Sequence, residues 1–425
     1  MKKRNIIFII LVIIIFFALS RVYKNDEKNK AEKNNDGISK INILISLDGN
    51  NGNKEIFEKH ISAFNKNSSK IQAIPYFVQL DVEAILKLIY VKEANQKYDI
   101  ACLGSNQIYS LVELGLIEPV DSYVTESFGT NWLEQMTPNS MANSTADGKL
   151  WSIPMLRNAR VVLFNKNLIN YTDDSITLPE LLLLAEEQNK KTNKTSLLAP
   201  LSEVLIEYIS YNSPFDSIAL NQKGKYLNIL DDNKINILDM AQKGVENKSI
   251  ENYTQNALKG MEVFLDGNIS TLVSNTYYAN KLINTANFPI SYIPLMLDEN
   301  TFFPLQGSNL YLIKQSDKTE YNKSWNALQK FWEIATEDVE LMNNGHIPIT
   351  VSQKENCISS GSVDNPSYLK AIKRNYNGCS GMAINQNTKI NLLLENMLGN
   401  VIYKKYEADK GLQEIQSIIN NILNE

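Results

Sequence analysis

The chain has 425 residues, 44% of them hydrophobic and 21% charged, and its formal net charge is −5 at pH 7. This composition excludes a wholly disordered chain and gives no reason to expect nucleic acid as a partner. Only two histidines and three cysteines are present, which argues against a His/Cys metal site. The length exceeds what one ordinary hydrophobic core accommodates, so two lobes are expected.

The first 20 residues have the features of an export signal. A basic segment, Lys2 to Arg4, precedes an unbroken apolar run from Ile6 to Leu19. As a helix, this run would measure roughly 21 Å, which is short of a hydrocarbon core of about 30 Å. We expect cleavage after Ser20, and the alternative is an uncleaved N-terminal anchor. In both cases the rest of the chain is exported, to the periplasm or to the outer face of the cytoplasmic membrane.

Residues 21–40 predict a disordered tether. They are rich in Lys, Asn, Asp and Glu and nearly lack apolar side chains. Such a segment cannot bury enough surface to become ordered. The folded part of the chain is therefore expected to begin at Ile41.

Strands and helices alternate after this point. Apolar and β-branched runs predict strands at residues 41–47, 71–78 and 98–103. The helical spacing of apolar residues predicts helices at residues 55–65, 82–92 and 108–116. The alternation indicates an α/β fold, in which an open sheet carries helices on its faces.

Ligands bind such sheets beyond the carboxyl ends of the strands. Two loops are expected there, residues 48–53 and residues 104–107. The polar candidates on these loops are Asp48, Asn50, Ser105, Asn106 and Gln107. Ser105 or Asn106 could instead cap the helix that follows.

The segment from Gly148 to Asn167, GKLWSIPMLRNARVVLFNKN, has hydrophobic ends and a polar, doubly basic middle. Arg157 and Arg160 would have to be paired if this middle lay wholly in a core. The pattern therefore favours a crossing between two lobes at the rim of a cleft. A guanidinium there could bind a phosphate or a carboxylate bidentately. The alternative is that Arg157 and Arg160 pair with carboxylates of the lobes.

Four further stretches have an order and spacing similar to those of a known family. They are YDIACLGSNQIYSLVELGLIEPVDSY, FLDGNISTLVSNTYYANKL, FFPLQGSNLYLIKQSDKTEYNKSWNALQKFWEIA and NNGHIPITVS. Together with the crossing segment, they resemble extracellular solute-binding protein family 1, the capture subunits of ABC importers of the maltose and glycerol-3-phosphate type. The chain departs from the family pattern at the crossing, where Leu156 to Arg160 replaces a Ser/Thr-rich stretch, and at two single positions. His346 stands where Tyr is usual, and Thr350 stands near an Arg of many glycerol-phosphate binders.

The resemblance implies a two-lobe periplasmic-binding-protein-like (class II) fold with the ligand cleft between the lobes. The first lobe would comprise residues 41–155 and 268–312, and the second would comprise residues 160–265 and 318–425. The implied function is that of an extracytoplasmic solute-binding subunit of an ABC importer. It would capture a sugar, an oligosaccharide or a glycerol-phosphate-like solute by hinge closure. It would then deliver the solute to the membrane permease, without a cofactor.

The resemblance also implies a set of ligand-binding residues. Sugars present apolar faces that stack on aromatic rings, and hydroxyl groups that form hydrogen bonds. The loop candidates named above are joined by Trp151, Arg157, Asn158, Arg160, Asn275, Tyr277, Gln306, Gly307 and His346. Trp151 stands out among the aromatic residues because it borders the crossing in sequence.

No enzymatic activity is expected. The sequence has no Gly-x-Ser-x-Gly elbow, no His-Glu-x-x-His motif and no phosphate-cradling P-loop. A carboxylate pair for glycoside cleavage stays open, because the separation of such a pair is a spatial quantity. The alternative function is a secreted or surface carbohydrate-active enzyme, or an adhesin, without a role in transport.

Two expectations concern the C-terminal segment. A disulfide between Cys357 and Cys379 would close a loop of about 22 residues and contribute on the order of 3 kcal/mol. The alternative is a pair of free thiols. A final helix is predicted over residues 391–424, with breaks near Gly399 and Gly411.

Overall fold

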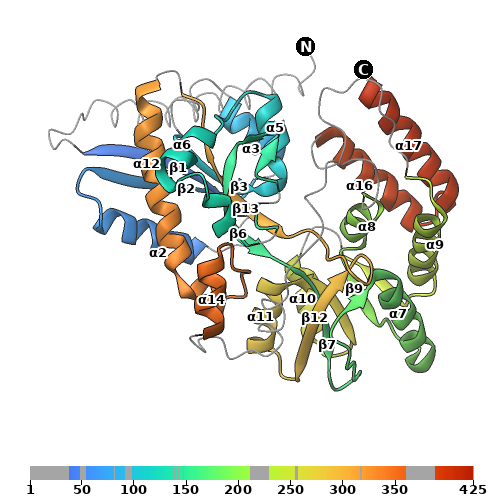
Figure 1. Cartoon of the computed structure of the whole chain (residues 1–425). Helices are drawn as coiled ribbons and strands as arrows, with labels where there is room; N and C mark the ends of the chain where they lie inside the picture. Colours follow the sequence, from blue (N-terminus) through green and yellow to red (C-terminus); the bar gives the residue numbers. More distant parts are fainter. Residues whose placement is uncertain are drawn as a thin grey trace, which may run out of the picture.

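The computed structural model describes residues 38–47, 54–80, 82–90, 98–137, 139–141, 143–146, 148–210, 229–253, 257–315, 318–359 and 388–424. The predicted signal, residues 21–37 of the tether, Asp48, Asn50 and Cys379 lie outside these ranges. Within them, the chain forms two mixed sheets with helices packed around each (Figure 1). No helix of the described ranges is long and apolar enough to span a membrane.

The first sheet has the strand order β2-β1-β3-β13-β6. Its strands are β1 (Ser39–Ser46), β2 (Ile71–Val78), β3 (Ile100–Gly104), β6 (Ser152–Asn158) and β13 (Gln306–Leu312). β1 is parallel to β2 and β3, whereas β13 is antiparallel to β3 and β6. The carboxyl ends of β1, β2, β3 and β6 and the start of β13 therefore share one edge of this sheet.

Helices cover this sheet because apolar residues on both of its faces need burial. In β1, Ile41, Ile43 and Ile45 enter one hydrophobic cluster, and Leu44 enters another on the opposite face. The surrounding helices are α2 (Lys54–Lys66), α3 (Val82–Tyr90), η1 (Ser105–Gln107), α5 (Ile108–Glu113), α6 (Asp121–Phe128), η2 (Trp132–Gln135), α12 (Lys318–Glu337), α13 (Val339–Asn343) and α14 (Val351–Ser359). A small hairpin joins β4 (Thr145–Ala146) to β5 (Lys149–Leu150). The strands and helices predicted between residues 41 and 116 are confirmed to within a few residues.

The second sheet has the strand order β10-β9-β11-β7-β12-β8. Its strands are β7 (Arg160–Asn165), β8 (Ile176–Thr177), β9 (Leu197–Ala199), β10 (Ile250–Asn252), β11 (Thr271–Asn275) and β12 (Ile290–Met296). Its helices are α7 (Leu178–Thr192), α8 (Leu201–Ser210), α9 (Asp232–Glu246), α10 (Ala257–Leu265), α11 (Thr276–Thr285), α16 (Thr388–Ile402) and α17 (Ala408–Asn424). Because β7 is antiparallel to β11 and β12, its start lies at the same edge as their carboxyl ends.

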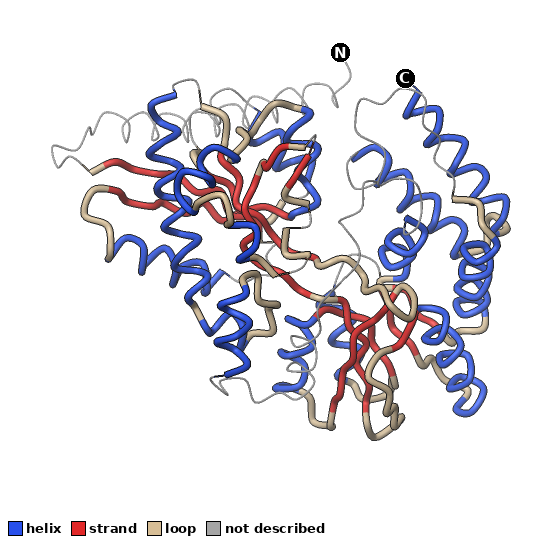
Figure 2. Tube along the Cα trace, viewed as in Figure 1, coloured by secondary structure: helices blue, strands red, loops and turns tan. Residues whose placement is uncertain are grey.

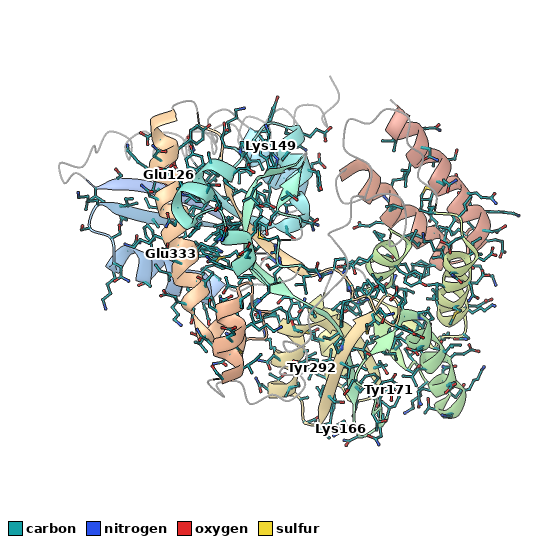
Figure 3. The ribbon with its side chains drawn as sticks, in the orientation of Figure 1. Glu126, Lys149, Lys166, Tyr171, Tyr292 and Glu333 are labelled. Atoms are coloured by element: carbon teal, nitrogen blue, oxygen red, sulfur yellow. The ribbon has the colours of Figure 1, made fainter. Side chains whose placement is uncertain are left out.

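The sheets define two lobes whose composition differs from the predicted division. β11 and β12 pair with β7, so the part of residues 268–312 before β13 belongs to the second sheet. α12 packs on α2, β6 and β13, so residues 318–359 accompany the first sheet, whereas α16 and α17 pack on α8 and α9. After β12 the chain returns to the first sheet, where β13 lies between β3 and β6. Figure 3 shows Glu126 and Glu333 on the first lobe and Tyr171 and Tyr292 on the second.

Two crossings join the lobes within the described residues. In the first, Ala159 alone separates β6 from β7, and in the second, residues 297–305 connect β12 to β13. Figure 2 shows the β6–β7 strand path running from one group of strands into the other. Two backbone hydrogen bonds clamp this path: Thr276 N donates to Ala159 O at 2.9 Å, and Ile347 N donates to Arg157 O at 2.7 Å. The crossing is thus held from both lobes.

Gly307, in β13, lets that strand approach β6 closely. Its φ is +150°, and a Cβ atom built on it would lie 1.9 Å from the carbonyl oxygen of Leu156. The register of β13 against β6 shifts directly after it, between Ser308 and Asn309. Glycine is therefore required here by space and by backbone conformation.

Candidate functional site at the crossing of the lobes

The candidate site lies where the carboxyl edges of the two sheets meet. Asn158, the last residue of β6, is the Cα partner of Gln306, the first residue of β13. Gly104, at the end of β3, is the Cα partner of Ser308, so η1 and Gln107 follow at the same edge. On the second sheet, Arg160 pairs with Asn275 at the corresponding edge. We call the group Gln107, Asn158, Arg160, Glu203, Glu207 and Gln306 the crossing site.

Two side chains of the crossing site carry buried acceptors that lack a partner among the described residues. Asn158 is 1% exposed and Gln107 is 6% exposed. Within the described part of the chain, neither Asn158 Oδ1 nor Gln107 Oε1 accepts a hydrogen bond. Leaving a buried acceptor unsatisfied costs about 1–3 kcal/mol, so native proteins rarely do so without a reason. Both atoms are therefore candidate contacts for a ligand.

Arg160 holds two carboxylates of α8. Its guanidinium donates to Glu207 through Nε and Nη2, both at 2.7 Å, and to Glu203 through Nη2 at 3.0 Å. Burial lowers the pKa of Arg160, but Glu207 and Glu203 outweigh burial and raise it overall. Burial raises the pKa of Glu207, and the charge of Arg160 opposes that rise. The predicted alternative for this residue, pairing with lobe carboxylates, is what the structure shows.

Gln306 joins this cluster from the first sheet. Its amide Nε2 donates to Glu203 and to Glu207, each at 2.9 Å. The ring of Phe303, in the second crossing, lies 5.8 Å from the Arg160 guanidinium carbon, within the range of a cation–π contact. Residues next to or within both crossings therefore contact the cluster of Arg160 with the α8 carboxylates. Within this cluster, the side chain of Glu203 is 55% exposed, whereas that of Glu207 is 9% exposed.

Arg157 is a structural tie of the first lobe. It is fully buried and donates to the Ser140 carbonyl at 2.8 Å, the Ser308 carbonyl at 2.9 Å and Asn309 Oδ1 at 2.7 Å. Burial lowers its pKa to about 10. The Arg157 guanidinium, which was expected to bind a ligand, is therefore surrounded by acceptors of the first lobe, because β6 directs this side chain into that lobe.

The start of α11 forms a second contact between the lobes. Asn275 caps α11 by accepting a hydrogen bond from Tyr278 N at 3.0 Å. The next residue but one, Tyr277, stacks on His346 with ring centroids 5.3 Å apart and an interplanar angle of 24°. Burial lowers the pKa of His346 to about 3, against an opposing hydrogen bond to the Arg157 backbone, so its imidazole is neutral at physiological pH. Asn275, Tyr277 and His346 thus flank the crossing next to α11.

The remaining predicted residues lie in different surroundings. Trp151 precedes β6, so it lies about 23 Å along the strand from Asn158, and its Nε1 donates to the Ala146 carbonyl at 3.0 Å. Ser105 is buried and Asn106 is exposed, and neither caps η1 or α5 through its side chain. Trp151 is therefore separated from the crossing site by the length of β6.

Glu203 and Glu207 were not among the residues predicted from the sequence. The missed signal is their spacing of four residues on the helix that follows the buried strand β9. This spacing places both carboxylates on one face of α8, at the carboxyl edge of a strand. Only the second sheet's strand order brings that edge next to Arg160.

A small cavity of about 170 Å³ lies farther along the same edge of the second sheet. Its lining includes Leu198, Asn252, Tyr253 and Lys259. Asn252 Oδ1 accepts a hydrogen bond from Leu201 N at 2.9 Å, which fixes the start of α8. The cavity therefore borders the helix that carries the crossing-site carboxylates.

Cys357 carries a free, buried thiol, and Cys379, the other cysteine of the predicted disulfide, lies outside the described residues. Burial raises the pKa of this thiol. Among the described residues, no group of three or more His, Cys, Asp or Glu side chains could hold a metal ion.

Comparisons with known proteins agree with this architecture. The maltose-bound MalE3 of T. maritima superposes with a TM-score of 0.71 at 14% identity, covering 90% of this chain and 100% of that one. UgpB of Mycobacterium tuberculosis, in complex with glycerophosphocholine, gives a TM-score of 0.70 at 14% identity, covering 91% of this chain and 99% of that one. These likenesses show the two-lobe fold.

Sequence comparison identifies the family. A binding protein of Brucella abortus is 27% identical over 116 residues, which span only 26% of this chain and 26% of that protein. The family model described as bacterial extracellular solute-binding protein matches residues 62–332, which is more than half of the chain. The chain belongs to the family of bacterial extracellular solute-binding proteins.

Proposed function

We propose that this protein captures a small polar solute of the sugar or glycerol-phosphate class at the crossing site and delivers it to an ABC permease. The observation that carries the proposal is the buried acceptor Oδ1 of Asn158, which has no partner among the described residues and lies on the strand that joins the lobes. The fold supports it, since structures similar to this chain hold maltose, α-D-tagatose and glycerophosphocholine. In this proposal the solute lies between the two lobes.

Contacts that form only when the lobes close would supply the binding energy. A ligand shifts an equilibrium between open and closed forms only if it makes more favourable contacts in one of them. Asn158 and Gln107 come from the first lobe, and Glu203 comes from the second. A solute that contacts both groups gains its full set of hydrogen bonds only when the lobes are close together. The hinge would lie at Ala159 and residues 297–305.

The remaining part of the proposal concerns partners and location. We propose that the protein acts after export, by way of the apolar segment from Ile6 to Leu19, and that the closed form docks on the permease. Capture without turnover is favoured over glycoside cleavage because the family comprises binding proteins. A carbohydrate-active enzyme or an adhesin is the competing function. Consumption of substrate by the protein would favour the enzyme.

The experiment is titration calorimetry with maltose, tagatose and glycerophosphocholine, on the wild-type protein and on Asn158→Ala. We expect at least one saturable ligand that is recovered unaltered. We expect Asn158→Ala to weaken its binding tenfold or more, because a satisfied buried acceptor contributes about 1–3 kcal/mol.

The control is Asn170→Ala, which removes an exposed amide of the second lobe. It should leave the affinity unchanged. Unaltered affinity in Asn158→Ala, or chemical conversion of the ligand, would contradict the proposal. Melting temperatures without ligand separate a loss of binding from a loss of folding.

A further inference from the structure

The crossing site is rich in hydrogen-bond acceptors. Asn158 Oδ1 and Gln107 Oε1 are buried acceptors without a partner in the described ranges. The carboxylate of Glu203 adds charged acceptor oxygens, and its side chain is 55% exposed. Such a site matches a solute that brings donors, as hydroxyl groups do.

The basic groups at the crossing are already engaged. Arg160 donates to both Glu203 and Glu207, and Arg157 is fully buried among acceptors of the first lobe. Neither guanidinium is presented to an anion in the way that a phosphate fork requires. The expectation that these arginines grip an anionic ligand therefore does not follow from their contacts.

The charges around Glu203 also disfavour an anionic solute. Arg160 carries one positive charge and faces two carboxyl groups, those of Glu203 and Glu207, so it cannot neutralise both when both are ionised. Between the two acids, Glu203 is the one that solvent and a ligand can reach. A phosphate group placed there would meet a like charge in a partly desolvated site, where repulsion is screened less than in water.

We propose that Glu203, positioned by Arg160 and Gln306, makes the crossing site selective for uncharged polyhydroxyl solutes and excludes their phosphate esters. This inference rests on the proposed function and narrows its solute class. Glu203 is the specificity-determining residue, and Arg160 is a positioning residue that fixes the carboxylate without contacting the solute.

The test compares neutral saccharides with their phosphate esters on the whole protein. Affinities for glucose and glucose 6-phosphate, maltose and maltose 1-phosphate, and glycerol and glycerol 3-phosphate are measured by calorimetry at low and high salt. We expect each neutral member that binds to bind at least tenfold more tightly than its ester. High salt should reduce this ratio, because added ions screen the repulsion.

Two variants assign the effect to the charge of Glu203. Glu203→Gln keeps the shape of the side chain and removes its charge, so the preference for the neutral member should fall at least threefold. Glu203→Asp keeps the charge and should retain the preference. The matched control is Glu187→Gln, which removes an exposed charge from α7 in the same lobe.

The outcomes separate this inference from the proposed function. An ester that binds as tightly as its neutral partner overturns the charge selection while the capture function stands. A preference that is unchanged in Glu203→Gln, with the fold intact by circular dichroism, also overturns it. If the protein binds no member of any pair and no glycerophosphocholine, the proposed function fails and this inference falls with it.

Discussion

Asp99 shows how a single, partly buried charge influences the stability of the first lobe. Its carboxylate accepts a hydrogen bond from the backbone N of Asn42 at 2.7 Å, at the start of β3. Burial raises its pKa from 3.8 to about 6, and the hydrogen bond from Asn42 only partly opposes this rise. The folded protein therefore binds this proton more tightly than the unfolded chain does. Stability is lost as the pH rises from about 4 to about 6, and the whole cost is present above pH 6.

We expect Asp99→Asn to stabilise the protein at pH 7.5 by about 1–3 kcal/mol, because the amide removes the buried charge and retains an acceptor for Asn42. At pH 4, where the native carboxyl group is protonated, the gain should vanish. Urea denaturation at both pH values measures it. The control is Asp239→Asn on α9, which should change stability by less than 0.5 kcal/mol. A gain that is equal at pH 4 and pH 7.5 would rule out the ionisation of Asp99 as its cause.

At the scale of single residues, the sequence predicted that buried arginines would require partners, but it did not identify those partners. Arg157 and Arg160 lie in a hydrophobic segment, so pairing was expected for both if they were buried. The partners of the two arginines differ. Arg157 donates to carbonyl and amide oxygens, whereas Arg160 donates to carboxylates of α8. No local pattern distinguishes these environments, because Ser140, Asn309 and Glu207 lie 17, 152 and 47 positions away in sequence from the arginine that each binds.

At the scale of elements, glycine shows how one residue type serves different purposes. Gly399 and Gly411 were expected to break the final helix, but Gly399 lies inside α16 and Gly411 inside α17. A Cβ atom on Gly411 would lie 2.2 Å from Val401 Cγ2, so this glycine permits close packing of the two helices. Gly399 has open space around it. The actual break, at residues 403–407, lies between the two glycines.

We expect Gly307→Ala to destabilise the protein by more than 2 kcal/mol, because the new methyl group would overlap the Leu156 carbonyl at the crossing. Gly399→Ala is the matched control. It adds the same methyl group in open space within a helix and should stabilise by up to about 1 kcal/mol. Thermal denaturation of both variants measures the contrast. If Gly307→Ala melted at the wild-type temperature, the close approach of β13 to β6 would be wrong.

The elements themselves were predictable in the first third of the chain. Residues 41–116 alternate between β-branched runs and helical spacing, and these are local signals of strands and helices. The assignment of later elements to lobes was not predictable in this way. β11 and β12 carry ordinary strand patterns, and only their pairing with β7 places them in the second sheet. Pairing partners depend on contacts that are distant in sequence.

At the scale of the whole molecule, two lobes meet along a narrow junction made of few segments. The crossing at Ala159 is held by Thr276 from the second lobe, and the preceding Arg157 carbonyl accepts from Ile347. On one side of this junction, α11 packs on the segment that holds His346, where a Cβ atom on Gly345 would lie 2.4 Å from the Thr276 carbonyl oxygen. Such tight packing favours a fixed pivot at α11. Closure would then occur on the side of α8 and the crossing site.

A distance measured between the two lobes tests whether they close on a small polar solute. Spin labels at Lys149→Cys, on the first lobe (Figure 3), and at Glu414→Cys, on α17, report this distance by pulsed electron resonance. Both positions are exposed. A second label pair, at Glu126→Cys and Lys149→Cys, lies within the first lobe and is the control.

A saturating neutral sugar should shorten the distance between Lys149→Cys and Glu414→Cys and leave the control distance unchanged. In Asn158→Ala, the same shortening should require at least tenfold more sugar. A distance that stays the same while calorimetry shows the sugar to be bound would contradict the account.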